Sequence, residues 1–194
     1  TSNIGLGSTA VDSITTGDNN VGLGDNALTA VTSGDSNTAI GKDSLKTVTT
    51  SSDNTAIGRS SLNNNTGSSN TAVGRKALET NTTASNNTAV GYYALLGNTT
   101  GTGNVSVGIQ ALQANTTASY NTAVGRLALN ANTTGADNTA LGNHAMGVNT
   151  TGSHNVAVGF AALDANTTAS YNTAVGRDAL TANTTGANNT ATGY

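Results

Sequence analysis

The sequence contains no cysteine, no proline and no tryptophan, and charged residues make up only 9% of it. Without cysteine the chain can form neither disulfides nor a thiolate metal site. Seven scattered Lys and Arg residues and a net charge of -3 leave no basic surface for nucleic acid. No apolar run approaches the ~20 residues needed for a transmembrane helix, so we expect no membrane span in this chain.

Apolar residues are also scarce for a globular protein. They form 35% of the 194 residues, against ~45–50% in ordinary soluble domains, and only 3% of the residues are aromatic. Scarce charge together with abundant Gly, Asn, Ser and Thr would be compatible with disorder. The order of the residues argues against disorder, because it is periodic from end to end.

A pentad of the form Asn-Thr-Ala-Val-Gly defines the period, and its glycine serves here as the anchor of each repeat. Asn stands four residues before every anchor, and Val, Ile or Leu stands one before it in eleven copies. Ten of the eleven intervals are 17 residues long, and the interval from Gly58 to Gly74 is 16. The anchors are Gly7, Gly24, Gly41, Gly58, Gly74, Gly91, Gly108, Gly125, Gly142, Gly159, Gly176 and Gly193. This period predicts one repeat domain over residues 1–194, with each repeat stacked on the next.

Each repeat has the residues of short strands and turns. In the pentad, β-branched and aliphatic residues alternate with Ala, which predicts a strand with Thr and Val on one face. The Ala-Leu pair that follows, such as Ala128-Leu129, suggests a second short strand, because about six residues are too few for a helix in water. Asn-Thr-Thr is turn chemistry. We therefore predict an all-β fold, a repetitive β-solenoid (β-roll) of about 11–12 rungs of 17 residues.

Stacking equivalent residues about 4.8 Å apart turns each repeat position into a ladder along the axis. The Val/Ile/Leu and Leu ladders are expected to form a thin core, with Ala where its walls come closest. The Asn ladder is expected to be buried and to bond along the axis, which would pair its amides. The predicted structural ladder residues are Asn37, Asn54, Asn70, Asn87, Asn121, Asn138 and Asn172, with the anchors Gly41, Gly58, Gly74, Gly91, Gly125, Gly142 and Gly176.

The predicted core is small for a free-standing rod, so association of several copies is expected. A homotrimer formed by lateral contact would bury more apolar area. The solenoid ends would be open β edges, which favours end-to-end polymerisation into a filament or continuation within the parent chain. Because the chain begins and ends within a repeat, we interpret it as a fragment of a longer repetitive protein.

The pentads Asn37-Thr38-Ala39-Ile40-Gly41 and Asn155-Val156-Ala157-Val158-Gly159, with Ala three residues after the glycine in most copies, resemble the head repeats of trimeric autotransporter adhesins. They are also similar to the shafts of phage tail fibres, and the resemblance covers the whole chain. Adhesin heads are left-handed parallel β-rolls in which three chains associate. The resemblance therefore implies an extracellular, non-enzymatic role in adhesion or spacing, although the adhesin repeat is usually shorter and lacks the Asn-Thr-Thr turn.

Residues that could carry chemistry are few and scattered. His144 and His154 occupy different repeat positions and have no Cys or second His nearby, so we predict no catalytic or metal role for them. Asp18 and Asp35 share one position in adjacent repeats, where a bound cation is an alternative to ordinary surface charge. We predict no enzymatic activity and no cofactor.

Charged residues stand only around the turns, which predicts that those positions face solvent. Arg and aromatic residues recur one residue after the anchor, and further aromatics stand five before it. Either packing between rungs or recognition of a host-surface glycan or receptor would account for them. The candidate recognition residues are Tyr92, Arg126, Phe160, Arg177, Tyr120 and Tyr171.

The Asn-Thr-Thr turn also has the form of an N-glycosylation acceptor. The candidate sites are Asn81, Asn98, Asn115, Asn132, Asn149, Asn166 and Asn183. Repetition of one turn motif would create these sequences without any glycan, so both interpretations stay open.

The sequence leaves two functions of different kinds. The first is a structural or adhesive fibre, such as an extracellular filament, an adhesin head or a tail-fibre shaft. The second is a solenoid that binds a regular surface, such as an ice-binding or carbohydrate-binding module. In the second, the hydroxyls of the turn threonines, from Thr82-Thr83 to Thr184-Thr185, would match a lattice.

Overall fold

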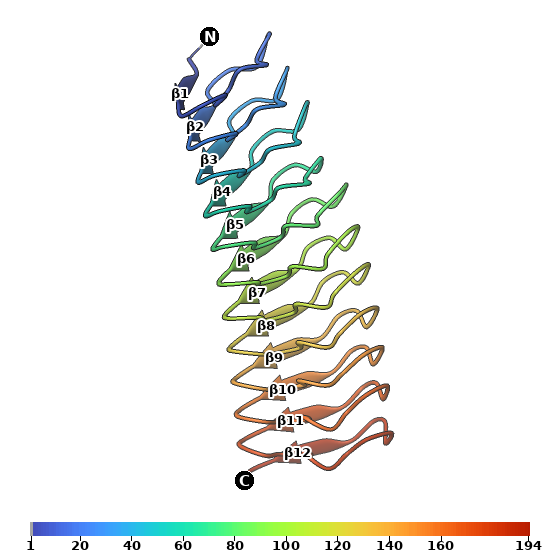
Figure 1. Ribbon diagram of the computed structural model, residues 1–194. Coiled ribbons are helices and arrows are strands. Elements are labelled where there is room, and N and C mark those ends of the chain that lie inside the picture. The colour runs from blue at the N-terminus through green and yellow to red at the C-terminus, as the bar shows by residue number, and fades with distance from the viewer. Residues whose placement is uncertain (1) are drawn as a thin grey trace.

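The computed structural model describes residues 2–194, which form twelve strands of three residues each. One strand ends at every anchor glycine, so the strands mark the repeats (Figure 1). The strands are β1 (Ile4–Leu6), β2 (Val21–Leu23), β3 (Thr38–Ile40), β4 (Thr55–Ile57), β5 (Thr71–Val73), β6 (Thr88–Val90), β7 (Val105–Val107), β8 (Thr122–Val124), β9 (Thr139–Leu141), β10 (Val156–Val158), β11 (Thr173–Val175) and β12 (Thr190–Thr192).

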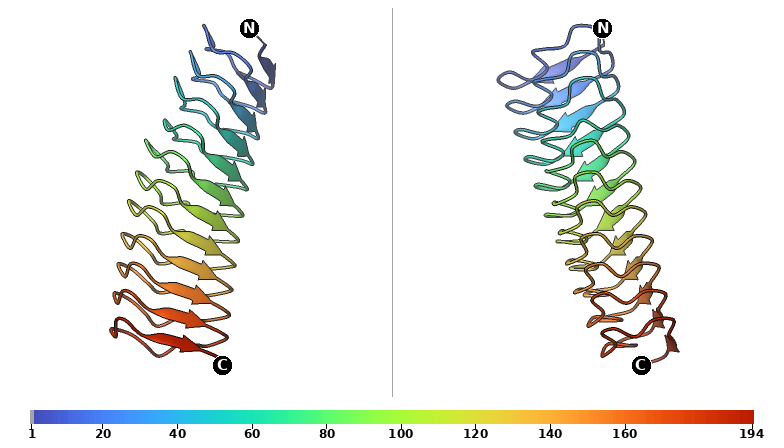
Figure 2. Two further views of the ribbon diagram at one scale, coloured as in Figure 1. Left: turned by 180° about the vertical axis from the view of Figure 1, so that it is seen from behind. Right: turned by 90° about the vertical axis from the view of Figure 1, so that its right-hand side faces the viewer.

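All twelve strands belong to one parallel sheet whose order follows the chain, from β1 to β12. Equivalent residues pair with each other, as Ala123 does with Ala140. The register holds across the shortened repeat, where Thr55 pairs with Thr71, so the missing residue is absorbed in the turn. The chain is an elongated column with its termini at opposite ends (Figure 2). The predicted all-β solenoid with 17-residue rungs is confirmed.

Each rung has one strand, and the second strand predicted at the Ala-Leu pair is wrong. The leucine of this pair has a positive φ, as Leu129 does at 49° and Leu163 does at 52°. Its backbone still bonds to the next rung, since Leu129 N donates to Ala145 O at 3.0 Å. The equivalent bond recurs along the column. The segment has to turn within a few residues to close the rung, and this left-handed conformation provides the turn at a cost of roughly 1–2 kcal/mol per residue.

The interior is lined by alanine and leucine, so the predicted place of the Val/Ile/Leu ladder in the core is also wrong. The central alanine of the strand points inward and is fully buried, as Ala123 and Ala140 are. The flanking strand residues point outward because side chains alternate along a strand. The fully buried Leu129 and its equivalents fill the space opposite. A narrow rung leaves room for one small residue from the strand and one large residue from the facing wall.

The anchor glycines occupy a conformation and a space that other residues do not fit. Their φ angles lie between +119° and +138°. A Cβ atom on Gly108 would lie 2.7 Å from the carbonyl carbon of Gly125 in the next rung. The anchors are therefore fixed both by their backbone angle and by the close stacking of the corners.

Candidate functional site

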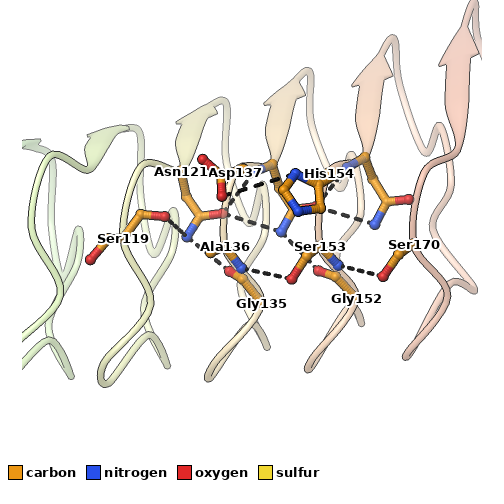
Figure 3. Close-up of polar contacts among 11 residues, drawn as sticks. Ser119, Asn121, Gly135, Ala136, Asp137, Gly152, Ser153, His154 and Ser170 are labelled. Atoms are coloured by element: carbon orange, nitrogen blue, oxygen red, sulfur yellow. Dashed lines mark hydrogen bonds and ion pairs between the residues drawn. The ribbon is translucent and has the colours of Figure 1, made fainter.

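The predicted asparagine ladder is present and buried. The Asn121 side-chain oxygen accepts hydrogen bonds from the backbone N of Asn138 at 3.0 Å and from its Nδ2 at 3.2 Å. Asn121 Nδ2 donates to Gly135 O at 2.9 Å (Figure 3). The ladder residues from Asn20 to Asn172 are fully buried. The amides therefore join successive rungs and satisfy backbone groups that would otherwise be unpaired.

A second buried asparagine ladder runs seven residues after the anchors. Asn132 Nδ2 donates to Asn115 Oδ1 at 3.1 Å and to Gly135 O at 2.9 Å. In the first three repeats the same position holds Ile14, Val31 and Val48. That exchange of asparagine for aliphatic residues is the sequence signal for an inward-facing position. The ladder predicted from the sequence did not include this position.

The candidate glycosylation sites are the members of this second ladder. Six of them, Asn81, Asn98, Asn115, Asn132, Asn149 and Asn166, are fully buried, and Asn183 is half-buried. A glycan would attach to Nδ2, the atom that donates in each ladder bond. The turn folds these side chains into the column, which favours the interpretation of the Asn-Thr-Thr sequences as a repeated turn motif.

The hydroxyl of the first threonine in each Asn-Thr-Thr turn can also form a hydrogen bond within the column. Thr133 Oγ1 donates to Thr150 O at 3.1 Å, and Thr116 Oγ1 donates to Thr133 O in the same way. This row of threonines therefore joins rungs to one another. It does not present a lattice of free hydroxyl donors.

The outer face of the sheet is a regular surface that runs from β1 to β12, and its residues carry no charge. We name its two rows the threonine row (Ile4, Val21, Thr38, Thr55, Thr71, Thr88, Val105, Thr122, Thr139, Val156, Thr173 and Thr190) and the aliphatic row (Leu6, Leu23, Ile40, Ile57, Val73, Val90, Val107, Val124, Leu141, Val158, Val175 and Thr192). Apolar side chains are left in contact with solvent, and Leu23 and Val175 are 44% and 40% exposed. Large exposed apolar patches mark interaction surfaces.

Two edges border the outer sheet face. The leading edge consists of the residues five and six before each anchor, and the trailing edge of those one and two after it. On the trailing edge, Arg75 donates to the Tyr92 hydroxyl at 3.3 Å, and the Arg177 guanidinium lies 5.3 Å from the Phe160 ring centre. The hydrogen bond between Tyr92 and Tyr93 raises the pKa of Tyr92 and lowers that of Tyr93.

The leading edge brings aromatic and charged groups of successive rungs together (Figure 3). The His154 ring stacks on that of Tyr171 with centroids 4.9 Å apart and planes 12° apart. His154 Nδ1 lies 4.0 Å from Asp137 Oδ2. The Ser153 hydroxyl accepts the Ala136 backbone N–H at 3.0 Å and ties the edge to the column.

The structure divides the six candidate recognition residues between the two edges. Tyr120 and Tyr171 lie on the leading edge, whereas Tyr92, Arg126, Phe160 and Arg177 lie on the trailing edge. All six are exposed. The two histidines are also separated, since His144 lies on the trailing edge. The six residues thus form two stripes and not one site.

The carboxylates of the N-terminal rungs bond mainly within the column. Asp35 Oδ1 accepts the backbone N–H of Asp18 at 2.7 Å, so these two residues are linked through the main chain. On the trailing edge, a hydrogen bond from Asn26 lowers the pKa of Asp43, and the positive charge of Lys46 acts in the same direction. Within residues 2–194, no three His, Cys, Asp or Glu residues cluster as metal ligands would.

Over the described part of the chain, no helix has the length and apolarity required to cross a membrane. Residues 2–194 also enclose no pocket. Comparison with protein-family models, with curated proteins and with solved structures found no match to the chain.

Proposed function

We propose that this chain is a segment of an extracellular structural and adhesive fibre, which assembles by contact between copies through the outer sheet face. The observation that carries the proposal is the uncharged face itself. Two outward rows of aliphatic and threonine side chains run the full length of the column, and the charged residues lie outside these rows. A solenoid that remained alone would leave this apolar strip in water, at a cost proportional to its area.

The dimensions of the face are sufficient for a stable contact. Eleven spacings of about 4.8 Å and a width of about 17 Å, which is the length of the five-residue pentad, give roughly 900 Å² per copy. Specific protein interfaces bury about 800 Å² per partner. Because equivalent residues repeat at the strand spacing, two such faces can stay matched over the whole column. The face thus combines adequate area with a shared period.

The resemblance of the pentads to trimeric adhesin heads supports a homotrimer as the assembled form and a cell surface, filament or virion as its location. The outward Val/Ile/Leu row supplies apolar residues for the centre of such an assembly. The exposed edges would then remain available for a host-surface glycan or receptor. This role requires no enzymatic activity and no cofactor.

Sedimentation equilibrium tests the proposal. The unmodified chain is expected to have an average mass above its monomer mass of 19.0 kDa, rising with concentration. The double variant Val124→Lys/Leu141→Lys places charges on the outer sheet face and is expected to sediment as a monomer. The matched control Thr134→Lys/Thr151→Lys places the same charges on exposed turn residues and should associate like the unmodified chain. A monomeric unmodified chain would contradict the proposal.

A second candidate function, binding of a regular surface such as ice, is favoured by the threonine row. Within residues 2–194 the hydroxyls of this row bond to no protein group, unlike those of the turn threonines. They are therefore free to bond ordered water. Thermal hysteresis of the chain, lost in Thr122→Lys/Thr139→Lys, would support this candidate. Freezing without hysteresis would exclude it.

A further inference from the structure

The two edges of the outer sheet face differ in charge. Six of the seven Lys and Arg residues lie on the trailing edge, at Lys42, Arg59, Arg75, Lys76, Arg126 and Arg177. The leading edge holds no Lys or Arg, and its charged residues are Asp18, Asp35, Asp53 and Asp137. The leading edge is therefore acidic. The trailing edge also holds Asp25, Asp43 and Asp178, and its six basic residues leave it with a net charge of +3.

We infer that copies of the chain associate in parallel and in register, with the leading edge of one copy against the trailing edge of the next. The inference rests on the proposed function, because it assumes that outer sheet faces meet. It adds the direction and alignment of the partner, which the uncharged face alone does not specify.

The geometry follows from rotation about the column axis. Rotating a copy by 180° about this axis turns its sheet face toward that of the first copy and exchanges the sides of its two edges. A leading edge then meets a trailing edge at the same rung. A threefold arrangement with the faces inward has the same property. An antiparallel pair instead brings like edges together and matches the N-terminal rungs of one copy with the C-terminal rungs of the other.

Oppositely charged residues border the same strand in two successive rungs. Asp35 and Lys42 flank β3, and Asp53 and Arg59 flank β4. The strand separates the members of each pair, and no ion pair joins them within residues 2–194. All four are exposed. Parallel copies in register would bring each acidic residue to the basic residue of its neighbour, which favours correct pairing.

The same matching continues with aromatic residues toward the C-terminus. Tyr120 and Arg126 flank β8, and Tyr171 and Arg177 flank β11. Each pair suits a cation–π contact between copies. The rung of β2 departs from the pattern, because Asp18 and Asp25 flank it. Four rungs spread from β3 to β11 nevertheless offer complementary residues at one alignment, without any shift between copies.

Charge reversal tests the alignment. The variant Asp35→Lys/Asp53→Lys makes both edges basic in these rungs, and we expect its self-association to weaken about 10-fold or more, as like charges meet in several places. Adding Lys42→Asp/Arg59→Asp restores opposite edges, and the fourfold variant should regain the original association. The control Thr100→Lys/Thr117→Lys/Thr134→Lys/Thr151→Lys adds the same net charge to exposed turn residues.

Fluorescence energy transfer tests the direction, and the absence of cysteine permits a single label. Copies labelled at Asp25→Cys with donor and acceptor are expected to show high transfer, because both labels lie at the same end. Mixing Asp25→Cys donors with Tyr194→Cys acceptors should give low transfer over about 50 Å. The reverse result would overturn the inference, as would a fourfold variant that stays weakened. If self-association does not change when the edge charges are changed, the inference is overturned but the proposed function is not. A monomeric unmodified chain would contradict both.

Discussion

At the scale of single residues, buried asparagine side chains form the hydrogen bonds that backbone groups form with one another in a wider sheet. Only three residues of each rung form a strand, so many backbone groups of the turns need other partners. Asn121 meets this need for Gly135 O and for the backbone N of Asn138. An amide suits the position because it carries both donors and an acceptor. The two ladders therefore stabilise turns that have few apolar contacts.

Replacing Asn121 with alanine is expected to destabilise the column by about 3 kcal/mol, since it leaves Gly135 O and the backbone N of Asn138 in the next rung without this partner. Urea denaturation followed by circular dichroism measures the change. Asn143→Ala serves as the control, because Asn143 lies on the trailing edge outside both ladders, and its effect should stay within about 0.5 kcal/mol. Equal effects of the two substitutions would contradict the role given to the ladder.

Left-handed backbone conformations are the second feature at this scale. Ala161 has a φ of 51° although it is not glycine, whereas its neighbour Ala162 has no positive φ and is fully buried. Glycine adopts positive φ without steric cost. Ala161→Gly is therefore expected to stabilise the chain by up to about 1 kcal/mol, and Ala162→Gly to destabilise it by about 1 kcal/mol. Thermal unfolding of the two variants measures the difference. Destabilisation by both would refute the argument.

At the scale of the element, the three-residue strand and its anchor glycine set the spacing of the rungs. A methyl group on Gly108 would meet the backbone of Gly125 and would also be strained at a φ of +135°. Gly108→Ala is expected to cost more than 2 kcal/mol, because backbone cannot move aside as a flexible side chain can. Urea denaturation provides the measurement. Tolerance of Gly108→Ala would contradict the close stacking of the corners.

Some features of the strands and turns could be predicted from the sequence, and others could not. The period and the invariant Asn four residues before the anchor predicted the solenoid, the register and the first ladder. Alternation alone could not predict which side chains of the strand point into the column, because Thr-Ala-Val is compatible with either face inward. The fully buried Leu129 on the opposite wall decides it, by leaving room only for Ala123. The turn conformation was missed because leucine rarely adopts positive φ.

The surfaces were predicted less completely than the fold. The charged positions were expected to face solvent, and all of them are exposed or partly exposed. Their division into two edges on either side of one face needed the structure. The burial of Asn132 and its equivalents was not predicted, because Asn-Thr-Thr is common in exposed turns. Tertiary packing overrides that preference where the amide has partners in the adjacent rungs.

At the scale of the whole molecule, the column is narrow, its apolar interior is continuous and its sheet face is left open. A solenoid of this kind is stabilised by contacts between neighbouring rungs, so its length can vary without a change in cross-section. Lateral contact through the outer sheet face would add apolar burial in every rung at once. In the proposed assembly, side-by-side association is therefore the step that turns a thin column into a fibre.

The measurement that tests this claim most directly is small-angle X-ray scattering of the unmodified chain, analysed for mass per unit length. Side-by-side association predicts two or three times the mass per length of one chain, which is 19.0 kDa over about 55 Å. The length of the particle should stay near that of one column. Particles with the mass per length of a single chain, whether short or joined end to end, would contradict association through the outer sheet face.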